Sequence, residues 1–402
     1  MRRPWSQHKQ TTLFAIFFVC ALAGMLLLTR IKEKESVINP FTLQAVSFLE
    51  GRFDIPIKTL LEKHNKNSVD FVQHKNKYYF PLPPAVSVLL IPFIFLFGIT
   101  YAAPILHYLL IILAAYFAYL FFKRRGLDAN TAKWLVYGLM FGSAFFGVCI
   151  FIGYVYVSHL LAVTLAFAAL YEREGRDRPW VIGSLTALTC ATRSTAGLAM
   201  ILFFGVSELL IKNDWRQKIK RLTVFFLPII CVSSVLLWFN FARFGNVLDF
   251  GYKTSILTMH PEHENREKYG LFHPYYIGQN IWYNFLNPVR PYATGGWNVD
   301  PRGINFFIVG PIFLWLLALR GWTRDRLAAV ITVAVTLVIL LCYYCTGAVQ
   351  YGTRYFCDFL PFLFLLLADV FKQQPLDRIV QLVLIGSAGI NLFLANILRM
   401  KY

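Results

Sequence analysis

Long apolar runs separated by short polar segments recur along the whole chain. The clearest runs cover residues 13–29, 134–152, 222–239, 327–343 and 379–397. Each is long enough to cross about 30 Å of hydrocarbon as an α-helix and is nearly free of charge. The strict alternation of a membrane β-barrel is absent, so we expect helices that satisfy their own backbone hydrogen bonds. The pattern predicts an all-α, polytopic protein with about eleven transmembrane helices in a single integral membrane domain over residues 1–402.

Composition agrees with this prediction and excludes an ordinary soluble protein. Of the 402 residues, 57% are hydrophobic and only 15% are charged, and the mean hydropathy is +0.54. The seven cysteines lie almost entirely in or beside apolar runs, so no disulfide framework is predicted. The formal net charge of +18 is typical of short cytoplasmic loops beside anionic membrane lipids, and we expect no nucleic-acid partner.

The distribution of basic residues orients the chain in the membrane. The apolar block 83–122 is too long for one helix and is interrupted by prolines, so its number of crossings is ambiguous. One net crossing, with part of 83–101 re-entrant or interfacial, puts every short basic loop on the cytoplasmic side. These loops are 123–125, 173–178, 212–221, 320–326 and 372–378. Residues 30–83 and 240–303 then form two long loops on the non-cytoplasmic side.

Both of these outer loops carry signals of folded structure. In the first, Asn39 is expected to cap a helix that begins at Pro40 and ends near Gly51. Such a short, one-sided helix is expected to lie on the membrane surface. The loop then returns to the bilayer through the sequence Tyr-Tyr-Phe-Pro-Leu-Pro-Pro at 78–84. In the second loop, the aromatic residues around Trp282 predict an interfacial helix.

A series of short motifs follows in a particular order along the chain. They are the helix after Asn39, the segment 78–84, Ser158-His159-Leu160, Ala191-Thr192-Arg193-Ser194, the run 240–252, and Tyr351-Gly352-Thr353-Arg354-Tyr355 before Asp358. In this order they resemble the GT-C superfamily of membrane glycosyltransferases, especially bacterial protein O-mannosyltransferases and lipid A aminoarabinose transferases. Each motif is weak alone, and their succession over nearly the whole chain carries the resemblance.

The resemblance implies a GT-C-like fold and the transfer of a sugar from a polyprenyl-phosphate-linked donor to a glycan, lipid or protein acceptor. It also implies a multi-pass protein of the bacterial inner membrane with its active site on the non-cytoplasmic face. The lipid-linked donor enters from the bilayer and the acceptor from water, so we expect the site where an outer loop meets helix ends. Transfer needs a carboxylate that takes the acceptor's proton and cations that stabilise the departing phosphate.

The chain departs from its relatives at the expected catalytic base. Relatives similar to the O-mannosyltransferases carry an acidic residue at the start of the first-loop helix, where this chain has Asn39. A neutral amide cannot act as a base. Among the carboxylates of the first outer loop we favour Asp70, which precedes the return to the membrane, and then Asp54. For Asp70, a solvated loop charge or a turn-forming residue is the competing interpretation.

Two arginines are the candidates for binding the donor phosphate. Arg354 lies between Tyr351 and Tyr355, and its planar guanidinium suits bidentate contact with phosphate. The competing interpretations are an arginine that reaches the membrane interface or one that pairs with Asp358. Arg193 lies in an otherwise apolar block, where a charge indicates a function or a partner, although a plain helix end also accounts for it.

Several further residues are candidates for contact with the substrate or with a metal. The substrate-contact candidates are His159, Tyr351, Tyr355 and Asn39. For His159, a sugar or metal contact competes with a satisfied interfacial histidine. The H-x-x-H spacing of His260 and His263 is more typical of a solvated turn than of a metal site, so no metal ligand is assigned and a divalent metal cofactor stays open.

A lipid-linked sugar flippase or transporter and a non-catalytic GT-C relative are the alternative functions.

Overall fold

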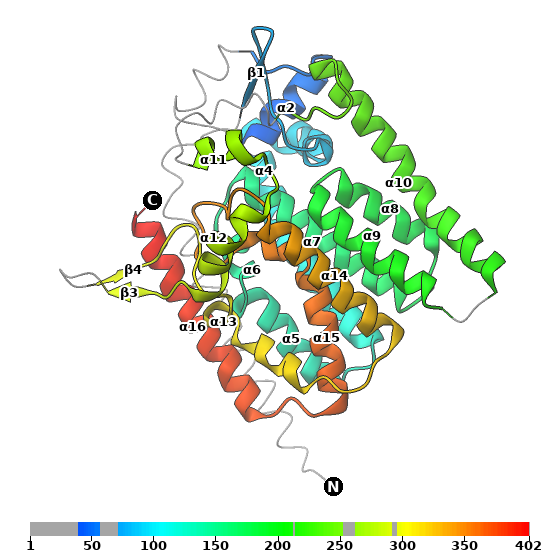
Figure 1. Cartoon of the computed structure of the whole chain (residues 1–402), viewed down its shortest axis with the longest axis vertical. Helices are drawn as coiled ribbons and strands as arrows, with labels where there is room; N and C mark the ends of the chain where they lie inside the picture. The colour runs from blue at the N-terminus through cyan, green and yellow to red at the C-terminus, as the bar shows by residue number, and fades with distance from the viewer. Residues whose placement is uncertain (1–38, 57–70, 212–213, 252–261, 292–295, 402) are drawn as a thin grey trace.

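Helices dominate the computed structural model of the chain (Figure 1). It describes residues 39–56, 71–211, 214–251, 262–291 and 296–401, so the predicted first span at 13–29 lies outside the described residues. Within them, four helices are long and apolar enough to cross a membrane: α4 (Ala85–Arg124), α7 (Tyr154–Arg173), α10 (Trp215–Phe244) and α16 (Arg378–Lys401). The mostly helical class is confirmed, and the total of about eleven crossings stays a prediction.

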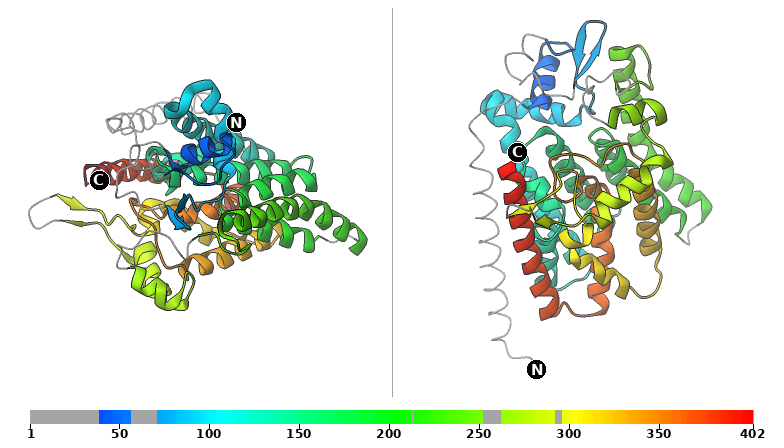
Figure 2. Two further views of the ribbon diagram at one scale, coloured as in Figure 1. Left: turned by 90° about the horizontal axis from the view of Figure 1, so that it is seen from above. Right: turned by 60° about the vertical axis from the view of Figure 1, so that its left-hand side comes forward.

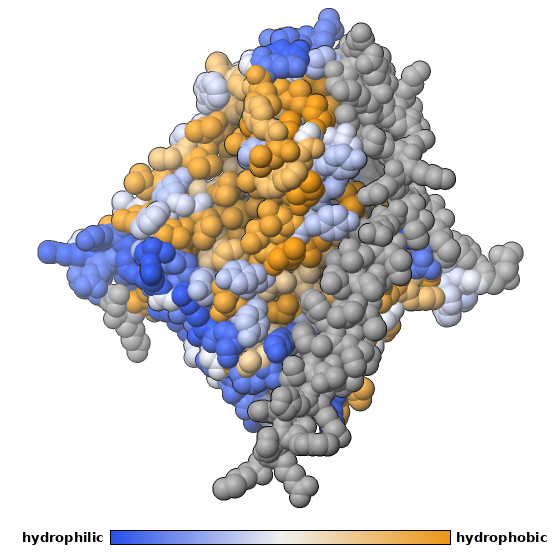
Figure 3. All heavy atoms as spheres, turned by 180° about the vertical axis from the view of Figure 1, so that it is seen from behind, coloured by the Kyte–Doolittle hydropathy of each residue, from blue (hydrophilic) through white to orange (hydrophobic). Residues whose placement is uncertain are grey.

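Apolar side chains cover a broad area of the molecular surface. Figure 3 shows one face with a continuous hydrophobic middle and hydrophilic residues gathered toward its ends. On α10, Leu227, Ile230 and Trp238 are 57–59% exposed. A soluble monomer rarely leaves so large an apolar surface open to water, so this surface suits lipid.

The apolar block 83–122 forms one element, α4, which changes direction at Gly98. This glycine has φ 76° and ψ 169°, a conformation that glycine adopts without the strain a side chain would cause. Beside it, Phe95, Leu96 and Tyr101 are 65–74% exposed. The predicted interruption of the block is confirmed. The first half of α4 packs against the first outer loop, and the number of crossings of the block stays a prediction.

The run 134–152, predicted as one span, is two helices. α5 (Ala129–Phe141) and α6 (Phe145–Ile150) are separated by Gly142, Ser143 and Ala144. The hydroxyl of Ser143 donates to the carbonyl of Leu139 at 2.7 Å and accepts from the amide of Phe145 at 3.2 Å. The hydroxyl thus replaces helical backbone partners locally, which hydropathy alone does not reveal.

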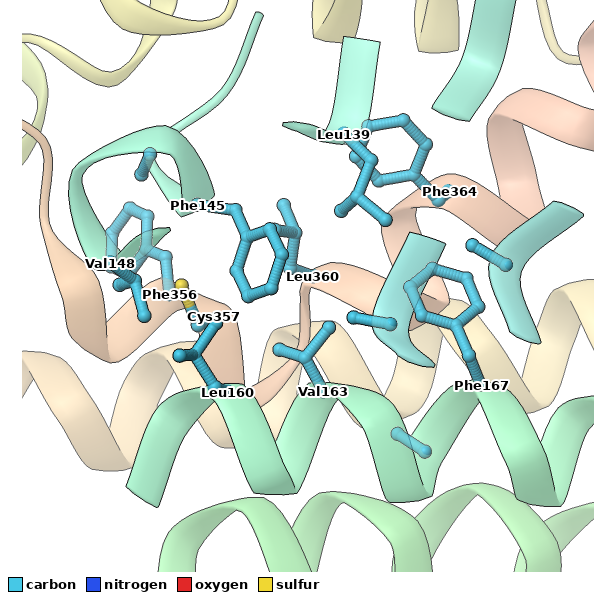
Figure 4. Packing of buried hydrophobic residues seen from close by; sticks show 14 of the residues in the cluster. Leu139, Phe145, Val148, Leu160, Val163, Phe167, Phe356, Cys357, Leu360 and Phe364 are labelled. Carbon is cyan, nitrogen blue, oxygen red and sulfur yellow. The ribbon is translucent and has the colours of Figure 1, made fainter. Parts of the chain in front are cut away.

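Helix α7 lies at the centre of the bundle. In its apolar window 83% of the residues are buried, and the helix packs against α4, α8 (Pro179–Cys190) and α15 (Leu360–Gln373). Figure 4 shows Leu160 and Val163 of α7 beside Phe145 and Leu360. In a membrane such packing gains van der Waals contact rather than expelling water, so close fit fixes where the helix ends lie.

The C-terminal part of the chain encloses this centre. It consists of α13 (Phe306–Val309), the 3-10 helix η4 (Pro311–Ala318), α14 (Arg324–Leu341), the 3-10 helix η5 (Arg354–Asp358), α15 and α16. Asn391 of α16 is fully buried, and its amide donates to the carbonyls of Phe141 at 2.8 Å and Val309 at 3.1 Å. This side chain ties α16 to α5 and α13.

Polar contacts draw the five predicted cytoplasmic loops together at one end of the molecule. Each contact joins two loops that are distant in sequence. These contacts are Arg125 with Glu174, Arg125 with Asp325 at 3.7 Å, Arg221 with Asp177 at 2.6 Å, and Gln373 with the Arg320 carbonyl at 2.8 Å. We call this the basic-loop end. The prediction that the five loops share one end is confirmed, while the membrane face to which they belong stays a prediction.

The first outer loop folds at the opposite end. Its helix α2 (Pro40–Leu49) is capped by Asn39, whose side-chain oxygen accepts from the amide of Phe41 at 3.0 Å, as predicted. Phe41 is fully buried, so one face of α2 packs on the protein. A hairpin follows, formed by β1 (Val72–His74) and β2 (Lys77–Tyr79). Figure 2 shows α2 and this hairpin together at one end of the bundle.

The second outer loop is folded into short elements. They are α11 (Glu262–Tyr269), the 3-10 helix η2 (Pro274–Tyr276), α12 (Ile277–Ile281), the π-helical turn η3 (Trp282–Leu286), β3 (Arg290–Pro291) and β4 (Trp297–Asn298). The helix expected around Trp282 is thus present. The buried amide of Asn280 donates to the carbonyls of Leu341 and Tyr343, both at 2.7 Å, and so fixes the loop to the end of α14. The two small ribbons add strands to the predicted all-α class.

Candidate functional site

A buried carboxylate, Asp358, organises a cluster of predicted site residues away from the basic-loop end. Asp358 ends η5, which packs against α7 and α9 (Ser194–Leu209). Arg193 binds it through two parallel contacts, Nε to Oδ1 at 2.8 Å and Nη2 to Oδ2 at 3.0 Å. The hydroxyl of Thr195 donates to Oδ2, and His159 Nδ1 lies 3.5 Å from Oδ1. Three segments of the chain, η5, α7 and the start of α9, therefore meet at one carboxylate.

The local sequence explains how Arg193 reaches this position. The apolar block 180–211 breaks at Thr192 and Arg193, so that α8 ends at Cys190 and α9 begins at Ser194, as the predicted helix end requires. Arg193 has extended backbone angles at the N-cap position, and its side chain turns toward η5. A charge in an apolar block needs a partner, and Asp358 supplies it.

The ion pair keeps Asp358 ionised. Burial alone raises the pKa of a carboxyl group, but the Arg193 guanidinium holds the pKa of Asp358 well below its usual range. A carboxylate with so low a pKa is a poor proton acceptor near neutral pH. Asp358 therefore suits a positioning role for Arg193 rather than that of the catalytic base.

Arg354 lies in the same region but has no acidic partner. Its side chain is buried, with a residue exposure of 8%. One terminal nitrogen donates to the carbonyl of Ala348 and lies 3.4 Å from Gln350 Oε1, while Nε has no hydrogen-bond partner in the described part of the chain. Among the described residues, no carboxylate lies within the 4.0 Å of an ion pair. The guanidinium is therefore a buried positive charge without a carboxylate partner in the described part of the chain.

The structure contradicts both competing interpretations of Arg354. Asp358 pairs with Arg193 instead of with Arg354, because η5 directs the carboxylate toward the start of α9. The side chain also does not reach out to the surface, since it is enclosed by protein. Its guanidinium carbon instead lies 5.2 Å from the ring centre of Tyr355 and 5.8 Å from that of Tyr156.

Of the predicted substrate-contact residues, His159 and Tyr355 belong to the cluster and Tyr351 does not. The rings of His159 and Tyr355 lie 6.1 Å apart, and the Arg193 guanidinium lies 5.5 Å from the Tyr355 ring. Tyr351 is fully buried against Gly147, and its carbonyl accepts from the amide of Ile304 at 2.8 Å. The structure thus gives Tyr351 a packing role.

The first outer loop reaches the same end of the molecule as the cluster. The amide of Ala85 donates to the carbonyl of Ala191 at 3.0 Å, two residues before Arg193. The ring of Phe80 lies 5.7 Å from that of Tyr154, at the start of α7. The motif 78–84 therefore connects the first outer loop to the helices that carry the cluster.

The candidate bases of the first loop are placed differently. Asp54 lies 3.4 Å from Lys77 Nζ, beside the hairpin. Asp70 lies outside the described residues. Asn39 is occupied by its cap hydrogen bond to Phe41. Among the contacts of the described residues, neither Asp54 nor Asn39 is a partner of Arg354, Arg193 or His159.

Metal binding has no centre in the part of the chain that the structure describes. No three His, Cys, Asp or Glu side chains there are grouped so that they could hold an ion. His260 lies outside the described residues, and the side chain of His263 is not described.

Sequence reasoning missed Thr195 and Gln350, and it gave Asp358 no role beyond a partner for Arg354. Gln350 accepts from the amide of Arg354 at 3.1 Å and donates to the carbonyl of Arg302 at 2.8 Å, so it links Arg354 to the second outer loop. One signal for Asp358 was available, because a lone acid and a lone base in two apolar segments are expected to pair.

Comparisons with known proteins place the fold. No protein-family model and no curated protein matches the chain. The crystal structure of ArnT from Cupriavidus metallidurans bound to undecaprenyl phosphate matches with a TM-score of 0.54 and 13% identity, over 90% of this chain and 60% of that chain. The apo structure of ArnT matches with a TM-score of 0.53 and 13% identity, over 94% and 62%.

The matched region spans about 60% of the length of ArnT, a lipid A aminoarabinose transferase of the GT-C superfamily. At this identity the likeness concerns the fold. The resemblance that the ordered motifs predicted is therefore confirmed for the fold, which this chain shares with ArnT.

Proposed function

We propose that this protein is a GT-C-type glycosyltransferase that moves a sugar from a polyprenyl-phosphate-linked donor to an acceptor. The fold shared with ArnT, which has been crystallised with undecaprenyl phosphate, supports this class of enzyme. The observation that carries the proposal is Arg354, a buried guanidinium without a carboxylate partner in the described residues. A protein that holds such a charge gains stability when an anion binds to it.

In the proposed reaction Arg354 binds the phosphate of the donor. The acceptor hydroxyl attacks the anomeric carbon and forms the new glycosidic bond. The bond between that carbon and the phosphate oxygen breaks, and its electron pair leaves with the lipid phosphate. Arg354 stabilises the negative charge that develops on this oxygen, because its donors are already held in place by the protein.

Arg193 has a different part in this proposal. Its charge is balanced by Asp358, so it adds little net attraction for a phosphate. With His159 and Tyr355 it shapes the wall beside Arg354. Tyr355 lies against both guanidinium groups, and its ring offers a flat face of the kind that stacks on a sugar.

The acceptor's proton passes to a carboxylate of the first outer loop, with Asp70 ahead of Asp54. The connection of this loop to the cluster through Ala85 and Ala191 supports that assignment. We place the site on the non-cytoplasmic face of the bacterial inner membrane. The separation of the cluster from the basic-loop end, which the positive-inside rule assigns to the cytoplasm, supports this orientation.

A transfer assay tests the proposal. Purified protein is incubated with a panel of undecaprenyl-phosphate sugars and a membrane glycolipid extract, and the release of undecaprenyl phosphate is followed by mass spectrometry. Arg354→Gln is expected to lower turnover by about 10²–10³-fold, as the loss of one oxyanion stabiliser does. Arg302→Gln, in the second outer loop, is the matched control and is expected to keep turnover.

The base is tested in the same assay. Asp70→Asn keeps the size of the side chain and removes its basicity, so turnover is expected to fall by about 10²–10⁴-fold with donor binding unchanged. If Asp70→Asn and Asp54→Asn both keep full turnover, the base lies elsewhere. If the unmodified protein consumes no donor of the panel, the transporter and non-catalytic alternatives replace the enzyme.

A further inference from the structure

A second positively charged pocket lies between the β1–β2 hairpin and the last turn of α10. Its volume is ≈ 380 Å³. Lys75 and Lys77 line it from the hairpin, and Arg243 lines it from α10. None of the described side chains that line it is acidic. The pocket therefore presents three positive charges and is large enough for a phosphate group.

Arg243 is the most constrained of these cations. Its residue exposure is 4%. Nη1 donates to the carbonyl of Phe80 at 2.9 Å, and Nη2 donates to Asn240 Oδ1 at 2.8 Å. Nε is buried and has no hydrogen-bond partner among the described residues. No described carboxylate lies within ion-pair distance, and Asp249 acts on the guanidinium only from farther away, so one donor is left unmatched.

The fold explains only part of this arrangement. The rings of Phe239 and Phe244 lie 3.8 Å and 4.8 Å from the guanidinium carbon, and the C-terminal end of a helix favours a cation. These contacts supply no full negative charge. Lys77 lies 3.4 Å from Asp54, which leaves Lys75 and Arg243 without an acidic partner in the described part of the chain.

We propose that this pocket binds an anionic group of the phosphate type, at a site separate from Arg354. The contacts of Arg243 lie with the first outer loop at Phe80, whereas those of Arg354 lie with residues 348–350. A tetrahedral anion accepts hydrogen bonds from several directions, so one ligand can contact both lysine side chains beside the positively charged guanidinium of Arg243. The inference does not depend on the transferase activity.

The surroundings admit two sources of such an anion. Trp238 and Phe241, next to the pocket on α10, are 57% and 55% exposed, on a helix apolar enough to cross a membrane. A phosphate carried by a lipid can thus enter the pocket while its chains stay along α10. Free phosphate or a phosphorylated soluble molecule can enter from water past the exposed hairpin.

Native mass spectrometry of the whole, detergent-solubilised protein tests the site. It is titrated with phosphatidic acid, with phosphatidylcholine as the neutral-headgroup reference, and separately with inorganic phosphate. We expect phosphatidic acid or inorganic phosphate to bind, with an affinity about tenfold lower in Arg243→Gln, as expected for the loss of a charge-assisted contact. Binding of phosphatidic acid alone identifies a lipid source, and binding of inorganic phosphate identifies a soluble one.

A second variant tests the pocket even if Arg243→Gln does not fold. The doubly substituted protein, with Lys75→Gln and Lys77→Gln, leaves the buried arginine in place and is expected to bind about threefold more weakly. Lys268→Gln, an exposed lysine of the second outer loop, is the control and is expected to bind as the unmodified protein does. Equal binding by the double variant and the control, or equal binding of phosphatidylcholine and phosphatidic acid, overturns the proposal. Arg354→Gln is expected to keep this binding, so failure here and failure of the transferase are distinguishable.

Discussion

The two ends of the molecule treat buried arginines in opposite ways. At the basic-loop end, Arg125 and Arg326 share the carboxylate of Asp369 through contacts of 2.8–2.9 Å. At the other end, Arg354 and Arg243 are as deeply buried, yet no described carboxylate pairs with them. The four arginines are similarly buried, but only those of the basic-loop end have described carboxylate partners that join helices, and we propose that the other two bind anionic ligands.

The difference has a physical basis. A buried ion pair roughly balances desolvation against attraction, so it adds little net stability but fixes the positions of its partners. At the basic-loop end this ties α4, α14 and α15 together. A buried cation without a partner lacks this attraction but still has the desolvation cost. Such a cation is therefore a candidate for binding an anionic ligand. Arg193 stands between the two cases, because it is paired with Asp358 and lies beside Arg354.

Removing the shared carboxylate of the basic-loop end is expected to have the largest effect. Asp369→Asn leaves Arg326 buried without a carboxylate partner and Arg125 with Glu174 and Asp325 only, which is expected to lower the free energy of unfolding by about 3–5 kcal/mol. The midpoint of thermal unfolding in detergent measures this loss. A midpoint equal to that of the unmodified protein would show that the basic-loop end does not need its ion pairs and would break the comparison.

Removing the carboxylate of the cluster is expected to cost less. Asp358→Asn should lower the free energy of unfolding by about 1–3 kcal/mol, because the Arg193 side chain is 17% exposed and water replaces part of the lost partner. The pKa of Asp358 is below its usual range in the folded protein, so its contribution is complete at neutral pH and is lost as the pH falls through the acid range.

The pH dependence supplies the control for this second variant. Unfolding midpoints of Asp358→Asn and of the unmodified protein are measured from pH 7 downward. Their difference is expected to stay constant near neutral pH and to shrink in acid. A difference that grows as the pH falls would contradict the ion pair.

Disturbing the support of Arg354 is expected to have a smaller effect, confined to catalysis. Gln350→Leu removes the oxygen that accepts from the Arg354 amide and the donor to the Arg302 carbonyl. The guanidinium is then less well placed for the transition state, and kcat is expected to fall about tenfold with little change in KM for the donor. A lower unfolding midpoint with unchanged kcat would assign Gln350 to folding alone.

An ion pair whose arginine is exposed, although the Glu172 side chain is only 10% exposed, sets the lower limit of the comparison. Arg178 binds Glu172 at 2.7 Å, and its side chain is 39% exposed. Surface pairs of this kind contribute little because water and salt screen them. Arg178→Gln is expected to leave the unfolding midpoint and the turnover unchanged. A loss comparable to that of Asp369→Asn would show that burial is not what separates the pairs.

The architecture could be predicted from sequence to the extent that hydropathy and charge encode it. The long apolar runs and the order of motifs led to the helical class and the ArnT-like fold, and the basic residues led to the shared loop end. The break at Ser143 was missed, because a hydroxyl that replaces backbone partners leaves the hydropathy of the run unchanged.

The site was harder to predict because it depends on which side chains meet. His159, Arg193, Arg354 and Tyr355 could be singled out one by one from their positions in apolar segments. Their grouping around Asp358 could not, since Arg193 and Asp358 are distant in sequence and η5 decides the direction of the carboxylate. Tyr351 was singled out in the same way from its neighbours in sequence, and in the structure it is fully buried against Gly147.

The cap at Asn39 bears on how the start of α2 can change during evolution. Aspartate and asparagine cap helices about equally well, and both present an oxygen where the amide of Phe41 needs one. Selection for folding therefore does not distinguish the two residues, and exchange between them leaves the loop intact. Proteins with aspartate and proteins with asparagine at this position can therefore have the same backbone, and only selection on the charge of the side chain distinguishes them.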